Sequence, residues 1–218
     1  MQQQNLRIPG PTPLPDEVRE ALSRPMINHR GAEFKALLKD ITPKVQHFYG
    51  TQNEVLFYTC SGTGGLEAAV VNTLSPGDKA VMVEIGVFGK RAITIAQNYG
   101  VNVVPYRVAW GQAADPQVLR DLLREHPDAK AVWLMHNETS TGVTNPMREL
   151  VEVIHAHSEA LILVDSVSGM AALPLPTDEL GLDVVVSGSQ KAWMIPPGLA
   201  TLSISDKAWK AYEQSRMP

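Results

Sequence analysis

Short runs of apolar residues recur along the chain and alternate with segments of helical periodicity. Continuous apolar runs predict strands at residues 55–58, 79–85, 101–106, 131–135, 160–164, 184–186 and 199–204. Helices are predicted at residues 65–74, 88–99, 117–125 and 147–156. Ahead of the first strand, apolar residues spaced three and four apart from Phe34 to Phe48 predict a core helix that Pro43 kinks. This alternation of strands and helices indicates an α/β fold.

The predicted strands are apolar on both faces, which is typical of a parallel sheet covered by helices. Residues 199–204 follow the preceding strand after too few residues for a crossover helix, so this run is expected to join the sheet antiparallel. We therefore predict that residues 16–218 form one doubly wound, mostly parallel sheet of about seven strands with one antiparallel strand. Residues 1–15 hold four prolines from position 9 onward and are predicted to form an extended N-terminal arm.

Composition narrows the class of protein. A chain of 218 residues, 44% hydrophobic and 19% charged, can bury a real core, which excludes disordered and collagen-like proteins. Its net charge of −4 argues against nucleic-acid and membrane partners. No apolar stretch approaches the ~18 residues of a membrane span, and residues 1–5 lack signal-peptide character, so we expect a cytoplasmic protein, with a peroxisomal or other organellar location left open. A single cysteine, Cys60, predicts neither an intrachain disulfide nor a cysteine-rich metal site.

Ligands of open doubly wound sheets bind beyond the carboxyl ends of the strands, so the loops there are the candidate sites. The first, residues 60–67, is a glycine-rich turn that opens a helix and leaves backbone amides unpaired. Those amides suit a phosphate group, with the hydroxyls of Ser61 and Thr63 beside them. The turn is not a P-loop, because no Gly-Lys-Ser/Thr follows. A tight strand-to-helix turn that needs glycine explains the same residues.

Two further loops each have two interpretations. Phe88 lies between two glycines after the second strand, where it covers a planar ligand ring or packs as an ordinary core phenylalanine. Residues 136–142 follow the fourth strand with a dense set of hydrogen-bonding side chains, which suits ligand orientation and equally suits turn formation. His136, the first of them, is a candidate ligand or base, although a structural histidine explains it better.

An aspartate and a lysine follow the fifth and sixth strands. Asp165 ends a fully apolar strand, where a buried carboxylate is costly unless a cation or hydrogen-bond donors meet it. Lys191 lies in a loop rich in serine and glycine, and burial there would lower its pKa and suit it to form a Schiff base. Considered singly, a capping aspartate and an exposed lysine explain the two residues.

Together these loops supply the parts that pyridoxal 5′-phosphate needs. Its aldehyde condenses with a lysine, its ring nitrogen pairs with an aspartate, and its phosphate binds at a helix N-terminus under an aromatic cover. The combination of a glycine-rich helix start, Phe88, Asp165 and Lys191 therefore predicts an enzyme that uses pyridoxal phosphate.

At this point the chain resembles a known family, the class V aminotransferases of fold type I. It is most similar to the serine–pyruvate/alanine–glyoxylate aminotransferase group. The resemblance covers essentially all 218 residues, and its motifs are Pro9-Gly10-Pro11-Thr12, Ser61-Gly62-Thr63-Gly64, Glu138-Thr139-Ser140-Thr141-Gly142, Asp165-Ser166-Val167-Ser168 and Ser187-Gly188-Ser189-Gln190-Lys191. It implies the large cofactor domain of the fold type I transferases.

The resemblance implies a role for each matching residue. Lys191 would be the catalytic residue that forms the Schiff base, Asp165 would hold the ring nitrogen, and Phe88 would cover the ring. The remaining contacts would come from Ser140 and Gln190 near the ring hydroxyl, from Thr63, Gly64 and Gly65 at the phosphate, and from Gly10 on the substrate side. The implied reaction moves an amino group from alanine or serine to a 2-oxo acid such as glyoxylate or pyruvate, in a homodimer.

Two departures from the family pattern and a comparison with a sister group qualify these expectations. Close relatives have a ring-stacking tryptophan where this chain has Phe88. Cysteine desulfurases, a sister group, have a histidine there and another directly before the lysine, where this chain has Gln190. A desulfurase-like enzyme is therefore the alternative, together with a binding remnant that performs no chemistry. The family also has a smaller C-terminal domain, which is expected to be absent from residues 1–218, so this chain alone is expected to be an incomplete enzyme.

Overall fold

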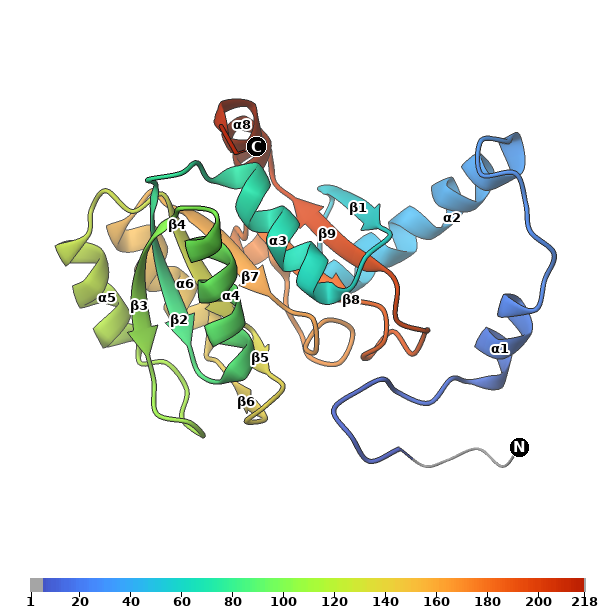
Figure 1. The fold of residues 1–218 in the computed structure, drawn as a ribbon, viewed down its shortest axis with the longest axis horizontal. Helices are drawn as coiled ribbons and strands as arrows, with labels where there is room; N and C mark the ends of the chain where they lie inside the picture. The colour runs from blue at the N-terminus through green and yellow to red at the C-terminus, as the bar shows by residue number, and fades with distance from the viewer. Residues whose placement is uncertain (1–5, 218) are drawn as a thin grey trace.

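The computed structural model describes residues 6–217, which fold around a seven-stranded sheet (Figure 1). Its strand order is β1-β9-β8-β7-β4-β2-β3. The strands are β1 (Glu54–Tyr58), β2 (Lys79–Glu84), β3 (Asn102–Arg107), β4 (Ala131–Met135), β7 (Leu161–Asp165), β8 (Val184–Gly188) and β9 (Ala200–Ile204). Strands β3, β2, β4, β7 and β8 pair in parallel, whereas β9 pairs antiparallel with both β8 and β1. The predicted fold class and the antiparallel last strand are confirmed.

Helices cover both faces of this sheet. Figure 1 shows α3 and α4 in front of the strands and α6 behind them. The helices are α1 (Asp16–Leu22), α2 (Ala32–Tyr49), α3 (Gly62–Thr73), α4 (Val87–Asn98), α5 (Pro116–Glu125), α6 (Met147–His157), α7 (Thr177–Leu180) and α8 (Asp206–Gln214). A two-stranded hairpin, β5 (Asn137–Glu138) with β6 (Val143–Thr144), follows β4. Of the described helices, α1, α7 and α8 were not predicted from the sequence.

The core follows from the apolar pattern. Every residue of the central strands β4, β7 and β8 is buried, as expected for strands covered on both faces. Helix α6 buries Met147, Leu150, Val151 and Ile154, a spacing of three and four that lines one face of a helix. Among residues 6–217, no helix combines the length and the apolar character that crossing a membrane requires.

Helix α2 forms as predicted, but it is not a core helix. It runs without interruption through Pro43, and Tyr49 is its one buried residue. Phe48 meets Trp193 edge to face, with ring centroids 5.3 Å apart, yet it remains 54% exposed, and Leu37 is 44% exposed. In Figure 1 the N-terminal half of the helix extends away from the sheet. An apolar stripe shows that a helix has a face to bury, but it does not say against what, so the prediction of burial was wrong.

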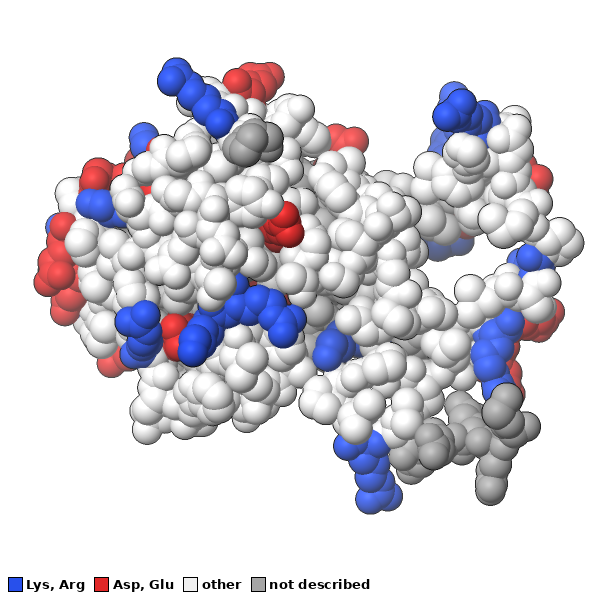
Figure 2. All heavy atoms as spheres, viewed as in Figure 1, with Lys and Arg blue, Asp and Glu red and all other residues white. Residues whose placement is uncertain are grey.

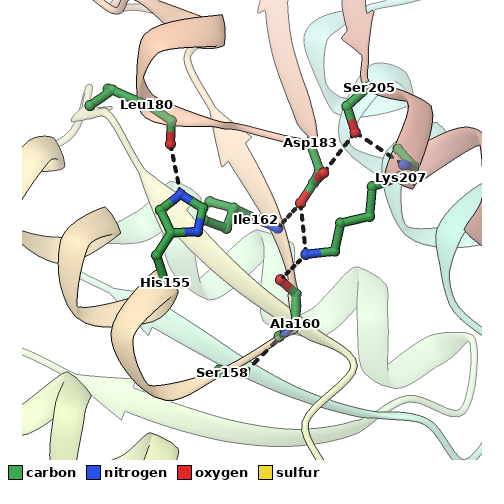
Figure 3. A network of polar contacts seen from close by, with 9 residues as sticks. His155, Ser158, Ala160, Ile162, Leu180, Asp183, Ser205 and Lys207 are labelled. Atoms are coloured by element: carbon green, nitrogen blue, oxygen red, sulfur yellow. Dashed lines mark hydrogen bonds and ion pairs between the residues drawn. The ribbon is translucent and has the colours of Figure 1, made fainter.

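A polar network fixes the amino ends of β7 and β8, opposite the candidate loops (Figure 3). Asp183 is 4% exposed, and its carboxylate accepts hydrogen bonds from the Ile162 amide at 2.8 Å and the Ser205 hydroxyl at 2.6 Å. The Lys207 ammonium lies 3.6 Å from the same carboxylate and donates to the Ala160 carbonyl at 2.9 Å. These bonds set the register of β7 and β8, and through it the positions of the residues at their carboxyl ends.

Candidate active site

The loops that follow five strands meet at one cavity of about 130 Å³ at the carboxyl edge of the sheet. The strands are β1, β2, β4, β7 and β8. The cavity is lined by Ser61, Gly62, Thr63, Leu66, Phe88, Arg91, Met135, Asn137, Thr139, Asp165, Val167, Gln190 and Lys191. All the chemistry-bearing loops picked out from the sequence therefore contribute to a single site.

Helix α3 begins at this cavity and presents open amides to it. Ser61 is the N-cap: its Oγ accepts a hydrogen bond from the Gly64 amide at 3.3 Å, and its carbonyl accepts one from the Gly65 amide at 3.1 Å. Within residues 6–217, no acceptor is recorded for the amides of Gly62 and Thr63, which lie at the first two helical positions. These two donors, at the positive end of the helix dipole, are free to bind an anion.

The glycines of this turn have different tasks. Of the three residues predicted to bind phosphate, Thr63 lines the cavity, whereas Gly64 and Gly65 lie outside the lining and their amides are used by the N-cap. A Cβ on Gly65 would come 2.8 Å from Val186 Cγ1, so this glycine is needed for α3 to pack closely on β8. The turn therefore combines tight packing at Gly65 with open amides at Gly62 and Thr63, and phosphate binding by those amides stays a prediction.

Asp165 ends β7 and lines the cavity although it is only 3% exposed. Its Oδ1 accepts a hydrogen bond from the Val167 amide at 2.9 Å. Burial raises the pKa of Asp165 to about 7; the Val167 bond opposes that rise, and the nearby Glu138 carboxylate adds to it. A carboxylate with this cost of ionisation favours a cation placed beside it.

Lys191 is half-buried on the same cavity, and the N-terminal arm covers it. Its Nζ donates a hydrogen bond to the Pro9 carbonyl at 2.9 Å. Burial lowers the pKa of the Lys191 amine, an effect that the Asp165 carboxylate opposes. The arm is fixed here because the Thr12 amide donates to the Gln190 carbonyl at 3.0 Å and the Thr12 hydroxyl to the Lys191 carbonyl, also at 3.0 Å.

Gly10 lies against the lysine side chain, outside the residues that line the cavity. Its φ is +150°, and a Cβ there would come 2.9 Å from both Cδ and Nζ of Lys191. Any other residue at position 10 would displace the amine or the arm, so Gly10 permits the close approach between them.

Phe88 lies on the cavity at the start of α4, half-buried, with an arginine beside it. The Arg91 guanidinium carbon lies 4.8 Å from the centre of the Phe88 ring, and Arg91 Nη1 donates a hydrogen bond to the Thr63 hydroxyl at 3.2 Å. The sequence analysis missed Arg91. Its signal was the spacing: a residue three positions after Phe88 on a helix lies on the same face.

Ser140 differs from its expected place. It is not part of the lining; its hydroxyl donates to Glu138 Oε1 at 2.7 Å and accepts from the Val87 amide at 3.0 Å. Thr139 and Asn137 line the cavity instead. These two residues belong to the same polar run, in which side-chain chemistry alone could not tell which members face inward.

Glu138 is fully buried and holds the start of α4 against this loop. Its carboxylate accepts hydrogen bonds from the Phe88 amide, the Gly89 amide and the Ser140 hydroxyl. The cavity wall that contains Phe88 therefore depends on a carboxylate that is outside the lining.

We expect Glu138→Gln to destabilise the fold by roughly 2–4 kcal/mol, because an amide nitrogen then faces backbone donors in a buried site. Urea unfolding measures this. The matched control is Glu149→Gln in the first turn of α6, an exposed acidic residue, which should change stability by less than about 0.5 kcal/mol. Equal stability of the two variants would contradict the capping role of Glu138.

His136 is a structural residue in this arrangement. It is 2% exposed, its Nδ1 lies 2.8 Å from the Ser166 hydroxyl, and its amide donates to the Asp165 carbonyl at 2.9 Å. Burial lowers the pKa of His136 to about 4, so the ring is neutral at neutral pH. It supports the Asp165 backbone and does not line the cavity. Within residues 6–217, no group of three or more His, Cys, Asp or Glu residues is arranged to hold a metal ion.

Comparison with known proteins agrees with this geometry. A family model described as Aminotransferase class-V matches residues 10–217. The chain belongs to this family. The predicted family is therefore confirmed, and the members of this family are enzymes that depend on pyridoxal phosphate.

Two relatives and one solved structure show how far the similarity extends. The soluble hydrogenase 42 kDa subunit of Anabaena cylindrica is 42% identical over 98% of this chain and 56% of its own length. The serine–glyoxylate aminotransferase of Methylorubrum extorquens is 38% identical over 96% of this chain and 53% of its own length. The alanine–glyoxylate aminotransferase of Nostoc sp. superposes with a TM-score of 0.94 at 28% identity, covering 100% of this chain and 57% of that one. The chain thus spans about half the length of the curated relatives that it matches.

The cavity of this member of the class V family fits the family's cofactor. Gln190 Oε1 is buried in a cavity-lining residue, and no group within residues 6–217 donates a hydrogen bond to it. The hydroxyl on the pyridoxal ring is a donor of the kind that this oxygen lacks. Asp165, Lys191 and the open amides of α3 add a carboxylate, an amine and anion-binding donors, which are the kinds of group that the cofactor's ring nitrogen, aldehyde and phosphate require.

Proposed function

We propose that the protein transfers the amino group of a small amino acid, alanine or serine, to a 2-oxo acid such as glyoxylate or pyruvate. The observation that carries the proposal is one cavity that holds both a buried carboxylate, Asp165, and a half-buried amine, Lys191, at the ends of adjacent strands. The serine–glyoxylate and alanine–glyoxylate names of its relatives support this choice of substrates.

Lys191 is proposed as the catalytic residue. When bound, pyridoxal phosphate supplies a protonated ring that accepts the electron pair left on the amino acid when its α-proton departs. Lys191 Nζ would hold the cofactor covalently at rest and, once displaced by substrate, would take the α-proton as a neutral amine and return it at the carbon on the other side of the amino nitrogen. The burial that lowers the pKa of Lys191 increases the fraction of neutral amine available for that task.

Asp165 is proposed to keep the cofactor's ring nitrogen protonated. A pyridinium beside the buried carboxylate would supply the cation that the site favours, and water is excluded from the pair. Phe88 would cover the ring, Gln190 would accept from its hydroxyl, and the phosphate would lie against the start of α3 with Thr63. We propose Thr139 and Asn137, not Ser140, as the ring-facing contacts from the loop after β4.

Other readings of the site are weaker. A desulfurase-like reaction remains the alternative enzyme, but Gln190 and Phe88 occupy the places where desulfurases carry histidines, and neither side chain exchanges protons at neutral pH. We also propose that the protein is a homodimer, which the half-exposed apolar face of α2 supports.

Covalent capture tests the proposed function. Borohydride treatment of the protein with pyridoxal phosphate is expected to add one cofactor to the intact mass, and peptide mapping is expected to locate it at Lys191. In separate samples that have not been reduced, alanine is offered with glyoxylate, serine is offered with glyoxylate or pyruvate, and cysteine is offered in parallel with detection of sulfide. The absence of an adduct at Lys191 refutes the cofactor site. In a protein that includes the family's smaller C-terminal domain, an adduct without amino transfer indicates a binding module. Sulfide release from cysteine alone indicates a desulfurase.

A further inference from the structure

Arg91 has no part in the predicted set of site residues, yet it lines the same cavity at the start of α3. We propose that the Arg91 guanidinium binds the phosphate group of the cofactor, as the side-chain cation of that end of the site. The inference rests on the proposed use of pyridoxal phosphate and adds a residue to its binding.

Position supports this role first. Arg91 Nη1 donates to the Thr63 hydroxyl at 3.2 Å, so the guanidinium lies beside the residue whose backbone amide is open at the start of α3. The other end of the cavity is occupied by Lys191, whose Nζ is turned toward the Pro9 carbonyl. Of the two cationic side chains that line the cavity, Arg91 therefore lies near the start of α3 and Lys191 lies near the N-terminal arm.

Charge supports it next. A phosphate ester carries about −1.5 to −2 charge near neutral pH. The amides of Gly62 and Thr63 and the helix dipole offer partial charges only. The first turn of α3 contains neither acidic nor basic side chains. Arg91 therefore supplies the full positive charge that this end of the cavity otherwise lacks.

The guanidinium is also held in place. Its carbon lies 4.8 Å from the centre of the Phe88 ring, which is one turn earlier on α4 and half-buried against the cavity. Arg91 remains solvent-exposed, and Figure 2 shows Lys and Arg side chains gathered on the viewed face beside α4. An arginine fixed on an aromatic ring can offer two parallel N–H groups to a phosphate, which a lysine cannot.

Paired ligands with and without phosphate isolate the contact. Pyridoxamine 5′-phosphate and pyridoxamine differ by that group alone, and neither has an aldehyde to react with Lys191. Equilibrium dialysis gives the dissociation constant of each ligand for the wild-type protein, Arg91→Gln and Arg91→Lys. The matched control is Lys90→Gln, which removes the same charge from the adjacent exposed position of α4.

We expect Arg91→Gln to raise the dissociation constant of pyridoxamine phosphate roughly ten-fold more than it raises that of pyridoxamine. This factor is at the low end for hydrogen bonds to a charged group, because the Arg91 side chain is exposed. Arg91→Lys should lie between wild type and Arg91→Gln, and Lys90→Gln should leave the ratio of the two constants near the wild-type value. Equal losses for both ligands in Arg91→Gln would overturn the inference and would assign Arg91 to ring contact. If Lys90→Gln changed the ratio of the two dissociation constants as much as Arg91→Gln does, the inference would also be overturned. That result would show that the positive charge of α4 as a whole, and not a contact from Arg91, favours the phosphate. Either result leaves the borohydride test of Lys191 untouched.

Discussion

Lys191→Ala is expected to lower the rate of the first half-reaction, loss of the amino group from alanine or serine, by roughly 10²–10⁴-fold or more. The substitution removes the group proposed to carry the proton between the two carbons on either side of the amino nitrogen, and within residues 6–217 no other side chain that lines the cavity is an amine. The cofactor should still bind through the start of α3 and Asp165. Single-turnover absorbance with the loaded protein measures the rate.

Small amines provide the control for Lys191→Ala. Methylamine or ethylamine in the buffer should restore part of the lost rate in Lys191→Ala and leave the wild-type rate unchanged, because a free amine can occupy the space left by the side chain. Circular dichroism checks that the variant is folded. A folded, cofactor-loaded Lys191→Ala with a rate near that of the wild type would eliminate Lys191 as the proton carrier.

Asp165→Asn is expected to change catalysis and stability in opposite directions. The half-reaction should slow by several orders of magnitude, because a neutral amide does not hold a ring proton in place. The protein without cofactor should become more stable than wild type at pH 8, by roughly 2–4 kcal/mol, because the cost of a buried charge is removed. The Asn oxygen can still accept the Val167 amide bond.

The pH dependence of that stability follows from the raised pKa. In the unfolded chain the Asp165 carboxyl ionises near its ordinary value of 3.8, whereas the folded protein keeps the proton to about pH 7. Between these values the unfolded state binds fewer protons, so the Asp165 contribution makes wild-type stability fall as the pH rises from about 4 to about 7. Asp165→Asn should lack this fall, and its advantage should vanish below about pH 4. Thermal unfolding from pH 4 to 8 measures the difference, with Glu125→Gln, an exposed carboxylate, as the control. Parallel pH profiles for wild type and Asp165→Asn would contradict the raised pKa.

The sheet was predictable because local patterns decide it. Seven apolar runs became the seven strands of the main sheet, and the short connection before residues 199–204 left antiparallel pairing as the available geometry. Burial of α2 was not predictable in the same way. Its stripe from Phe34 to Phe48 gives the correct helix, but whether a stripe is covered depends on surfaces far away in the sequence. In the described structure the C-terminal half of the helix, which includes Val45 and Tyr49, meets such a surface.

The site was predictable as a set of loops and less so as a set of atoms. Asp165 and Lys191 could be identified from their residue types. Burying a carboxylate or an amine at the end of an apolar strand costs free energy unless a partner compensates for it. Within residues 138–142, three hydroxyl side chains follow each other, and their chemistry does not distinguish them. The course of the backbone decides that Thr139 lines the cavity and that Ser140 donates a hydrogen bond to Glu138. Arg91 could not be picked out from the sequence, because most arginines on helices face solvent. Its role depends on the start of α3 lying beside it, and the sequence does not give that contact.

The place of β9 between β8 and β1 has a consequence for how the protein is made. Residues 54–58 pair with residues 200–204, which closes a loop of about two-thirds of the chain, an entropically costly contact that forms late. Helix α3, whose start holds the open amides, packs through Gly65 against Val186, Ala200 and Leu202. A chain emerging from the ribosome can pair β2, β3, β4, β7 and β8 early, but the surface that seats α3 is complete only when β9 has joined β8. Cofactor capture during synthesis should therefore begin only after Ile204 has left the exit tunnel.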